Sequence, residues 1–184
     1  TDSRALASVA VQFFVNGAVF ASFVPRFPEI RDRLGLSLDE LGVMLTIGAL
    51  IGLVASMASP AIIHRLGTRR ALIALVMFML VGLVIVGFAS TPVLFLIGFS
   101  AILMADGVVD VAMNLQGSWL SARRHAPVMN RLHGFWSLGT VAGGLVAAQA
   151  AASGVSLRTQ LIIVAVVLAA ALVFVGRGLL QVDE

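Results

Sequence analysis

The sequence predicts an all-α membrane protein whose six transmembrane helices form two inverted repeats of three helices each. Composition is the first observation: 60% of the 184 residues are hydrophobic, 11% are charged, and the mean hydropathy is +1.06. A soluble domain has about 45–50% apolar and about 25% charged residues. The second observation is that the apolar residues form long runs, since a membrane-spanning helix needs about 20 of them. A chain of this length therefore holds at most about six spans with short loops.

Six apolar runs of this kind follow one another along the chain. They lie at about residues 5–24, 38–63, 71–89, 92–120, 128–152 and 157–175. Pro25 and Pro28 end the first run, because proline cannot donate a backbone hydrogen bond. Ser37 and Glu40 match a capping box at the start of the second, and Pro92 stands at the start of the fourth, where proline is favoured.

Small residues recur at helical spacing in two of these spans. The second span carries Gly48, Gly52 and Ser56, and the fifth carries Gly139, Gly143, Gly144 and Ala147. Small side chains allow two membrane helices to approach closely. We therefore expect each of these faces to pack directly against a neighbouring helix.

The arginines divide unevenly between the two sides of the expected membrane. All twelve basic residues are arginines, eight on one side and four, diluted by acidic residues, on the other. The eight are Arg4, Arg65, Arg69, Arg70, Arg123, Arg124, Arg131 and Arg177. The positive-inside rule then predicts that both termini are cytoplasmic. Six spans with both ends on one side divide into repeats of about 1–90 and about 91–184 that start on opposite sides, an arrangement typical of transporters.

Residues 26–37 form a short, charged connection between the first two spans. We expect this connection to lie at the membrane surface. Arg26 is interpreted as a surface anchor, and the alternative is that it pairs with an acidic neighbour at the outer gate.

The fourth span carries a polar stripe. Asp106, Asp110 and Asn114 are four residues apart, so they lie on one face of a helix. A carboxylate near the centre of a membrane helix costs about 2.5–3.5 kcal/mol on insertion scales. We interpret Asp110, with Asp106 as a second candidate, as the site that takes up and releases a coupling proton. The alternatives are an Asp110 that stays protonated and bonds between helices, and an Asp106 that caps or bridges to the first span.

Further polar residues in the spans are candidates for binding a small polar solute. They are Asn16, Asn114, Gln116, His133 and Trp136. The amides can bond to hydroxyl groups of a solute, and the indole ring can lie over the face of a sugar. The alternative is that the amides bond between helices, at about 0.6 kcal/mol per bond, and that Trp136 belongs to the aromatic belt at the interface.

Three stretches resemble sequences of the major facilitator superfamily. His64-Arg65-Leu66-Gly67-Thr68-Arg69-Arg70 resembles its motif A turn, with His64 in the place of an Asp. Residues 25–42 and 110–139 look like runs of the bacterial YbjJ-like branch, which is related to the fucose permease group of sugar/proton symporters. The resemblance implies that Asp110 matches a proton site of that group. It also implies a conformational gate, or alternatively a topology signal only, at His64, Arg65, Gly67, Arg69 and Arg70.

Proteins of this superfamily have twelve spans in two six-helix halves with the substrate between them. The resemblance therefore implies that residues 1–184 form the amino-terminal half, and that a carboxy-terminal half or a second chain completes the transporter. It also implies a proton-coupled symporter of the bacterial cytoplasmic (inner) membrane, with a small polar solute, a sugar being one candidate, moved by alternating access.

Other functions stay open at this point. One is a membrane scaffold or accessory subunit with the same fold, and another is a drug or metabolite exporter. An enzyme is not expected, because the chain has no cysteine, no paired His-Glu metal motif and no recognisable Ser-His constellation. We expect no metal, no cofactor and no nucleic-acid partner, since the chain lacks a Gly-Lys-Ser/Thr phosphate loop and its arginines are scattered between apolar runs.

Overall fold

A computed structural model describes residues 2–181, apart from the side chains of residues 174 and 175. The helices are α1 (Asp2–Ala21), the 3-10 helix η1 (Val24–Arg26), α2 (Phe27–Leu34), α3 (Leu38–Ser56), α4 (Ser59–Leu66), α5 (Thr68–Phe88), α6 (Pro92–Arg124), α7 (Met129–Ala152) and α8 (Leu157–Gly176). The described part of the chain contains no strand, as predicted. Residue 1 and residues 182–184 of the expected 1–184 domain lie outside the described residues.

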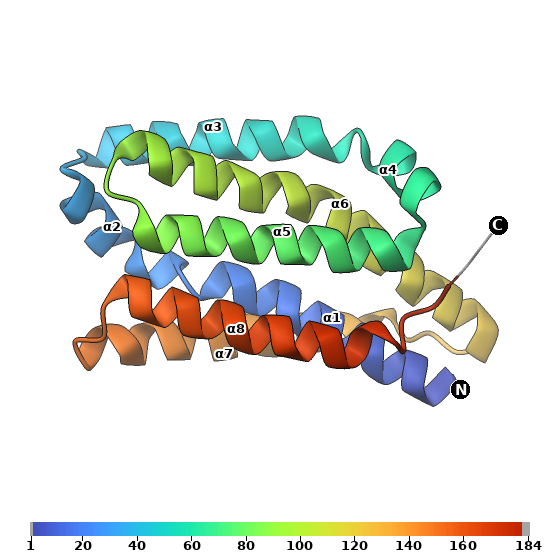
Figure 1. Ribbon diagram of the computed structural model, residues 1–184. Helices are drawn as coiled ribbons and strands as arrows, with labels where there is room; N and C mark the ends of the chain where they lie inside the picture. The colour runs from blue at the N-terminus through green and yellow to red at the C-terminus, as the bar shows by residue number, and fades with distance from the viewer. Residues whose placement is uncertain (1, 182–184) are drawn as a thin grey trace.

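The long helices run lengthwise through one bundle (Figure 1). The start of α1 and the end of α8 lie at the end of the bundle that carries the α4–α5 and α6–α7 turns, and α2 lies at the opposite end. Five segments are long and apolar enough to cross a membrane, and they are Asp2–Leu34, Leu38–Ser56, Thr68–Phe88, Pro92–Arg124 and Met129–Ala152. The apolar stretch Leu157–Val173 in α8 is shorter. The multi-pass helical architecture is confirmed, and the sixth span stays a prediction.

The predicted helix starts are confirmed in detail. Ser37 Oγ accepts from the backbone N–H of Glu40 at 3.2 Å, and the Glu40 carboxylate accepts from the backbone N–H of Ser37 at 2.7 Å. This reciprocal pair satisfies backbone donors that the first turn of α3 leaves free. Thr91 caps α6 in a simpler way, since its hydroxyl accepts from the N–H of Leu94 at 3.2 Å.

The second span differs from its prediction, because a break divides the expected helix 38–63 into α3 and α4. Pro60 has no N–H to donate to the carbonyl of Ser56, four residues before it, and its ring crowds that carbonyl. The hydroxyl of Ser59 donates to the Ser56 carbonyl instead, at 2.6 Å, and lies 3.3 Å from the backbone oxygen of Gly107 in α6. The prediction of one continuous span was therefore wrong.

Helices of the two expected repeats pair with one another. α1 packs along α7 and α3 packs along α6, so the first helix of each expected repeat lies against the second helix of the other. α5 contacts both α6 and α8, and α8 also contacts α1. A two-fold axis relating two inverted repeats would convert the α1–α7 pair into the α6–α3 pair, which is why we retain the two-repeat hypothesis.

Glycines bring α7 into backbone contact with α1. A Cβ atom added at Gly139 would overlap the backbone oxygen of Phe14, and one added at Gly143 would lie 2.7 Å from that of Ala18. Gly144 is different, because an added Cβ there meets open space. The predicted close-packed face is thus confirmed at Gly139 and Gly143, and it does not extend to Gly144.

The small-residue face of α3 packs against α6. A Cβ atom added at Gly52 would lie 3.0 Å from the backbone oxygen of Leu103. From the other side, a Cβ added at Gly107 would lie 2.8 Å from Ser56 Cβ and 3.0 Å from the backbone oxygen of Gly52. The expected face of the second span is therefore confirmed.

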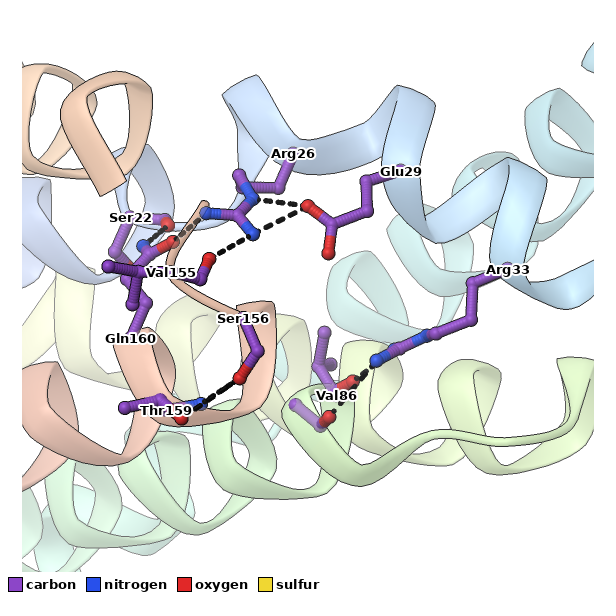
Figure 2. A network of polar contacts seen from close by, with 10 residues as sticks. Ser22, Arg26, Glu29, Arg33, Val86, Val155, Ser156, Thr159 and Gln160 are labelled. Carbon is purple, nitrogen blue, oxygen red and sulfur yellow. Dashed lines mark hydrogen bonds and ion pairs between the residues drawn. The ribbon is translucent and has the colours of Figure 1, made fainter. Parts of the chain in front are cut away.

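Arg26 is buried at the end of the bundle opposite the termini, with an exposed fraction of 3%. Its guanidinium donates to the Glu29 carboxylate at 2.6 Å, to Gln160 Oε1 at 3.0 Å and to the backbone oxygen of Val155 at 2.9 Å (Figure 2). Gln160 in turn donates to the backbone oxygen of Ser22. The interpretation of Arg26 as a surface anchor was wrong, and the alternative of an acidic neighbour is confirmed. The network ties the end of α1 to the start of α8.

We predict that Gly139→Ala destabilises the protein, whereas Gly144→Ala does not. The new methyl group at position 139 has to push α7 away from the backbone of α1, and overpacking of this kind costs about 1–3 kcal/mol. At position 144 the methyl group meets no atom, and the better helix propensity of alanine is worth up to about 1 kcal/mol. The apparent Tm of the purified protein in detergent measures the difference. Equal Tm values for the two variants would contradict the close contact.

We also predict that Arg26→Met lowers the Tm much more than Arg31→Met. The first change leaves the buried side-chain oxygen of Gln160 without this donor, at about 1–3 kcal/mol, and also removes the donor to the half-buried backbone oxygen of Val155. Arg31 is a suitable control because, among residues 2–181, it pairs only with its exposed neighbour Asp32, and such surface pairs are worth about 0–1 kcal/mol. A similar loss in both variants would show that the network of Figure 2 adds nothing to stability.

Candidate functional site

A groove of about 380 Å³ lies between α1, α6 and α7. Its lining residues are Phe13, Asn16 and Phe20 of α1, Asp106, Asp110 and Met113 of α6, and His133 and Trp136 of α7. The structure therefore brings together five of the predicted site residues from three helices that are far apart in the sequence.

Asn16 is the centre of a hydrogen-bonded chain across these three helices. Its Nδ2 donates to Asp106 Oδ1 at 2.7 Å, and its Oδ1 accepts from the indole N–H of Trp136 at 2.9 Å. An indole only donates, so the carbonyl end of the Asn16 amide has to face Trp136 and its NH₂ end has to face Asp106. The bridge from Asp106 to the first span, which was one of two interpretations, is thus present.

Asp110 lies one helical turn beyond Asp106, and its side chain is exposed on the groove. Asn114 Nδ2 donates to its Oδ1 at 3.1 Å and to its backbone oxygen at 2.8 Å. Within residues 2–181 the ion pairs are Arg26–Glu29, Arg31–Asp32 and Arg123–Asp2, so no arginine neutralises Asp110. The groove consequently contains a carboxyl group that is accessible and has no cationic partner among the described residues.

Aromatic side chains form the remaining walls. The rings of Phe13 and His133 meet edge to face, with centroids 5.4 Å apart. His133 Nδ1 lies 3.0 Å from the backbone oxygen of Met129, which requires the proton on Nδ1 and leaves Nε2 of the neutral ring as an acceptor. His133 and Trp136 are three residues apart on α7, so both side chains face the same way. The groove thus offers apolar ring faces beside a few polar atoms.

Gln116 lies elsewhere, although it was predicted beside the other site residues. It is buried, and its Nε2 donates to Thr68 Oγ1 at 2.9 Å and to the backbone oxygen of Leu180 at 2.7 Å. Its Oε1 accepts from the backbone N–H of Leu180 at 2.9 Å. Six residues of α-helix separate Gln116 from Asp110 by about 120° around the axis, so the two side chains cannot share a face.

The residues of the predicted gate lie together at and beside the turn between α4 and α5, and none of them lines the groove. They are His64, Arg65, Gly67, Arg69 and Arg70. Gly67 has a φ of 72°, a left-handed conformation that favours glycine and allows the abrupt change of direction between the two helices. No arginine of this turn forms an ion pair with a described residue. The gate itself stays a prediction.

The sequence interpretation missed Phe13, Phe20 and Met113, which also line the groove. Their spacing could have revealed them. Phe13 and Phe20 lie three residues before and four residues after Asn16, and Met113 lies three residues after Asp110, which places them on the same helix faces as the polar residues.

Comparison with known proteins agrees with this architecture. Residues 9–183 match the family model described as Major Facilitator Superfamily. The membrane protein MosC of Rhizobium meliloti is 32% identical over 138 residues, which are 75% of this chain and 34% of MosC. An uncharacterized transporter of Sinorhizobium fredii is 29% identical over 142 residues, 76% of this chain and 38% of that protein. An uncharacterized MFS-type transporter of Yersinia pestis is 25% identical over 136 residues, 74% of this chain and 35% of that protein.

Two facts follow from these comparisons. The chain spans about a third of the length of the curated relatives it matches. The family match covers nearly all of the chain, and it is to a family of transporters rather than of enzymes. The multi-pass helical bundle and its polar groove fit that assignment, and the chain belongs to the major facilitator superfamily.

Proposed function

We propose that this chain is the amino-terminal six-helix half of a proton-coupled secondary transporter that moves a small polar solute by alternating access. Asp110 is the observation that supports this proposal most strongly. Its carboxyl group lies in a membrane helix, faces a groove and has no arginine partner among the described residues. Ionisable groups in membrane helices are costly and are candidates for function by default.

The contacts suggest different roles for the two carboxyl groups. Asp106 is held by Asn16, whose other end is held by Trp136, so these two hydrogen bonds fix the position of the Asp106 carboxyl group in the groove. Asp110 is held only by Asn114 of its own helix, and it is the group that we propose to exchange a proton with the solvent of the groove. Asp106 is the second candidate for this exchange.

Solute binding is proposed at the polar atoms that reach the groove. Asp106, Asn16 and His133 provide hydrogen-bonding atoms, and Trp136 and the partly buried Phe20 provide ring faces. Such a combination of a few polar groups with aromatic walls is common in sites for small molecules, and a sugar of the kind that the YbjJ-like resemblance implies fits this chemistry. Asn114 would act by holding Asp110, and Gln116 is left out because its amide bonds to Thr68 and Leu180.

The rest of the transporter is proposed on two grounds. The groove is open on one side, so a second six-helix half or a second chain would have to close it during transport. In addition, α3 and α7 expose large apolar residues such as Leu53 and Leu145, which are 64% and 65% exposed. We expect the intact protein from its own membrane to have about twice the 19.2 kDa mass of this chain. A mass of 19.2 kDa would instead require a second copy or another subunit.

The orientation proposed here places both chain ends in the bacterial cytoplasm. The start of α1 and the end of α8 lie at the same end of the bundle as the α4–α5 turn, beside which Arg65, Arg69 and Arg70 stand (Figure 1). This agrees with the positive-inside rule. In this orientation the proposed gate of His64, Arg65, Gly67, Arg69 and Arg70 faces the cytoplasm.

We predict that Asp110→Asn abolishes accumulation of the solute against its gradient and leaves exchange intact. Asparagine keeps the size and polarity of the side chain but cannot take up a proton, so the site can still bind solute while the coupling is lost. The measurement is uptake into proteoliposomes that contain the full-length protein, with an imposed pH gradient and a panel of sugars and other small polar solutes. Accumulation should fall at least about tenfold, while counterflow of labelled solute continues.

Asp39→Asn is the matched control, because Asp39 is exposed at the start of α3 and outside the groove. It makes the same change of charge and should leave accumulation unchanged. If Asp110→Asn accumulates solute normally, Asp110 is not the coupling site. If the double change of Asp106 and Asp110 to Asn also leaves accumulation unchanged, neither carboxyl group is the coupling site. A scaffold would instead give no uptake of any solute in the panel, even in the unchanged protein.

A further inference from the structure

We propose that a cleft between α1 and α8 binds an anionic phospholipid, whose phosphate is held by Arg4 and Arg177. The cleft has a volume of about 720 Å³ and lies outside the groove of Asp110. Its lining includes Arg4, Ser8 and Val11 on α1, and Ala170, Val173 and Arg177 in α8 and directly after it. The site would be a lipid-binding surface of the membrane protein rather than part of the solute pathway.

The lining changes from polar to apolar along the cleft. On α1, Arg4 is followed by Ser8 and then by Val11, at a spacing that keeps all three on one helix face. Arg4 and Val11 are separated by about 10 Å along the helix axis at 1.5 Å per residue. α8 runs in the opposite direction, so Arg177 lies at the arginine end and Ala170 lies further along (Figure 1). This order matches a phospholipid, with a charged head and an apolar chain.

The position of Arg177 is fixed by a close contact between the end of α8 and α1. A Cβ atom added at Gly178 would overlap the hydroxyl oxygen of Ser8. The backbone beside Arg177 therefore lies directly on α1, next to the mouth of the cleft. Neither Arg4 nor Arg177 forms an ion pair within residues 2–181, and the nearby Asp2 pairs with Arg123 at 3.2 Å.

An anionic lipid is the occupant that this chemistry favours. Guanidinium groups bind phosphate through paired, charge-assisted hydrogen bonds, and two arginines, Arg4 and Arg177, line the cleft. Basic pockets between membrane helices recognise acidic headgroups for this reason. A free phosphate ion would bind the arginines but would leave the apolar wall of Val11, Ala170 and Val173 without a contact. A zwitterionic lipid would cover the apolar wall, but its headgroup would be attracted less strongly to the two positive charges.

Native mass spectrometry of the full-length protein tests the site, with phosphatidylglycerol and phosphatidylcholine titrated separately. We expect one phosphatidylglycerol to bind at least about tenfold more tightly than phosphatidylcholine. Arg4→Gln or Arg177→Gln should weaken phosphatidylglycerol about tenfold, the effect of losing a charge-assisted hydrogen bond. Arg124→Gln is the matched control, because Arg124 is exposed at the same end of the bundle and outside the cleft. It should leave the affinity unchanged.

A second pair of variants tests the apolar half of the cleft without changing charge. Ala170→Leu should fill the apolar part of the cleft and weaken the binding of both lipids. Ala148→Leu, at an exposed position of α7, should leave the binding of both lipids unchanged.

Equal binding of the two lipids to the unchanged protein would overturn the proposal. If Arg124→Gln lost as much affinity for phosphatidylglycerol as Arg4→Gln and Arg177→Gln, binding would reflect only the general positive charge of this surface. Displacement of phosphatidylglycerol by millimolar inorganic phosphate, with no effect of Ala170→Leu, would make this a free-anion site and would also overturn it.

Discussion

The close approach of α1 to α7 is the contact on which the candidate site depends. Gly139 and Gly143 let the two backbones touch, and no residue with a Cβ atom fits there without movement. Because the backbones touch, the indole of Trp136 reaches Asn16 at 2.9 Å, and Asn16 in turn reaches Asp106 of α6. A wider spacing would break this chain, and the three helices would no longer share one polar groove. Packing of small residues thus positions the polar chemistry.

The polar residues of α1 and α6 correspond to one another, which supports the proposed repeats. Asn16 and Asp106 are 90 residues apart, and each precedes a glycine that packs on the second helix of the other expected repeat, at Trp136 and at Gly52. The same interval separates Arg26 from Gln116. Both side chains are buried, and each binds the region where the third helix of the other expected repeat begins. One amide and one carboxyl group at equivalent positions therefore meet between α1 and α6, at the groove.

Local sequence patterns predicted several features of the bundle but not the places of the buried polar groups at its ends. Three kinds of feature could be predicted, because each depends on local spacing or on the cost of a polar group in lipid. They are the starts of α3 at Ser37 and of α6 at Thr91, the faces of small residues, and the bridge from Asp106 to α1. Arg26 and Gln116 could not be placed. Their partners are 134 and 64 residues away in the sequence, and no local pattern indicates which distant backbone groups need a donor.

The sequence by itself determined the class of the protein, since long apolar runs require helices that satisfy their own backbone hydrogen bonds in lipid. It also determined the polar stripe of α6, because four-residue spacing fixes a helix face. Only the tertiary structure decided which polar residues share a groove. That choice depends on how the helices are rotated against one another. Contacts of glycines such as Gly139 and Gly52 set this rotation, and the sequence of a single helix does not encode it. For the same reason, only the packing of α8 on α1 brought Arg4 and Arg177 to one cleft.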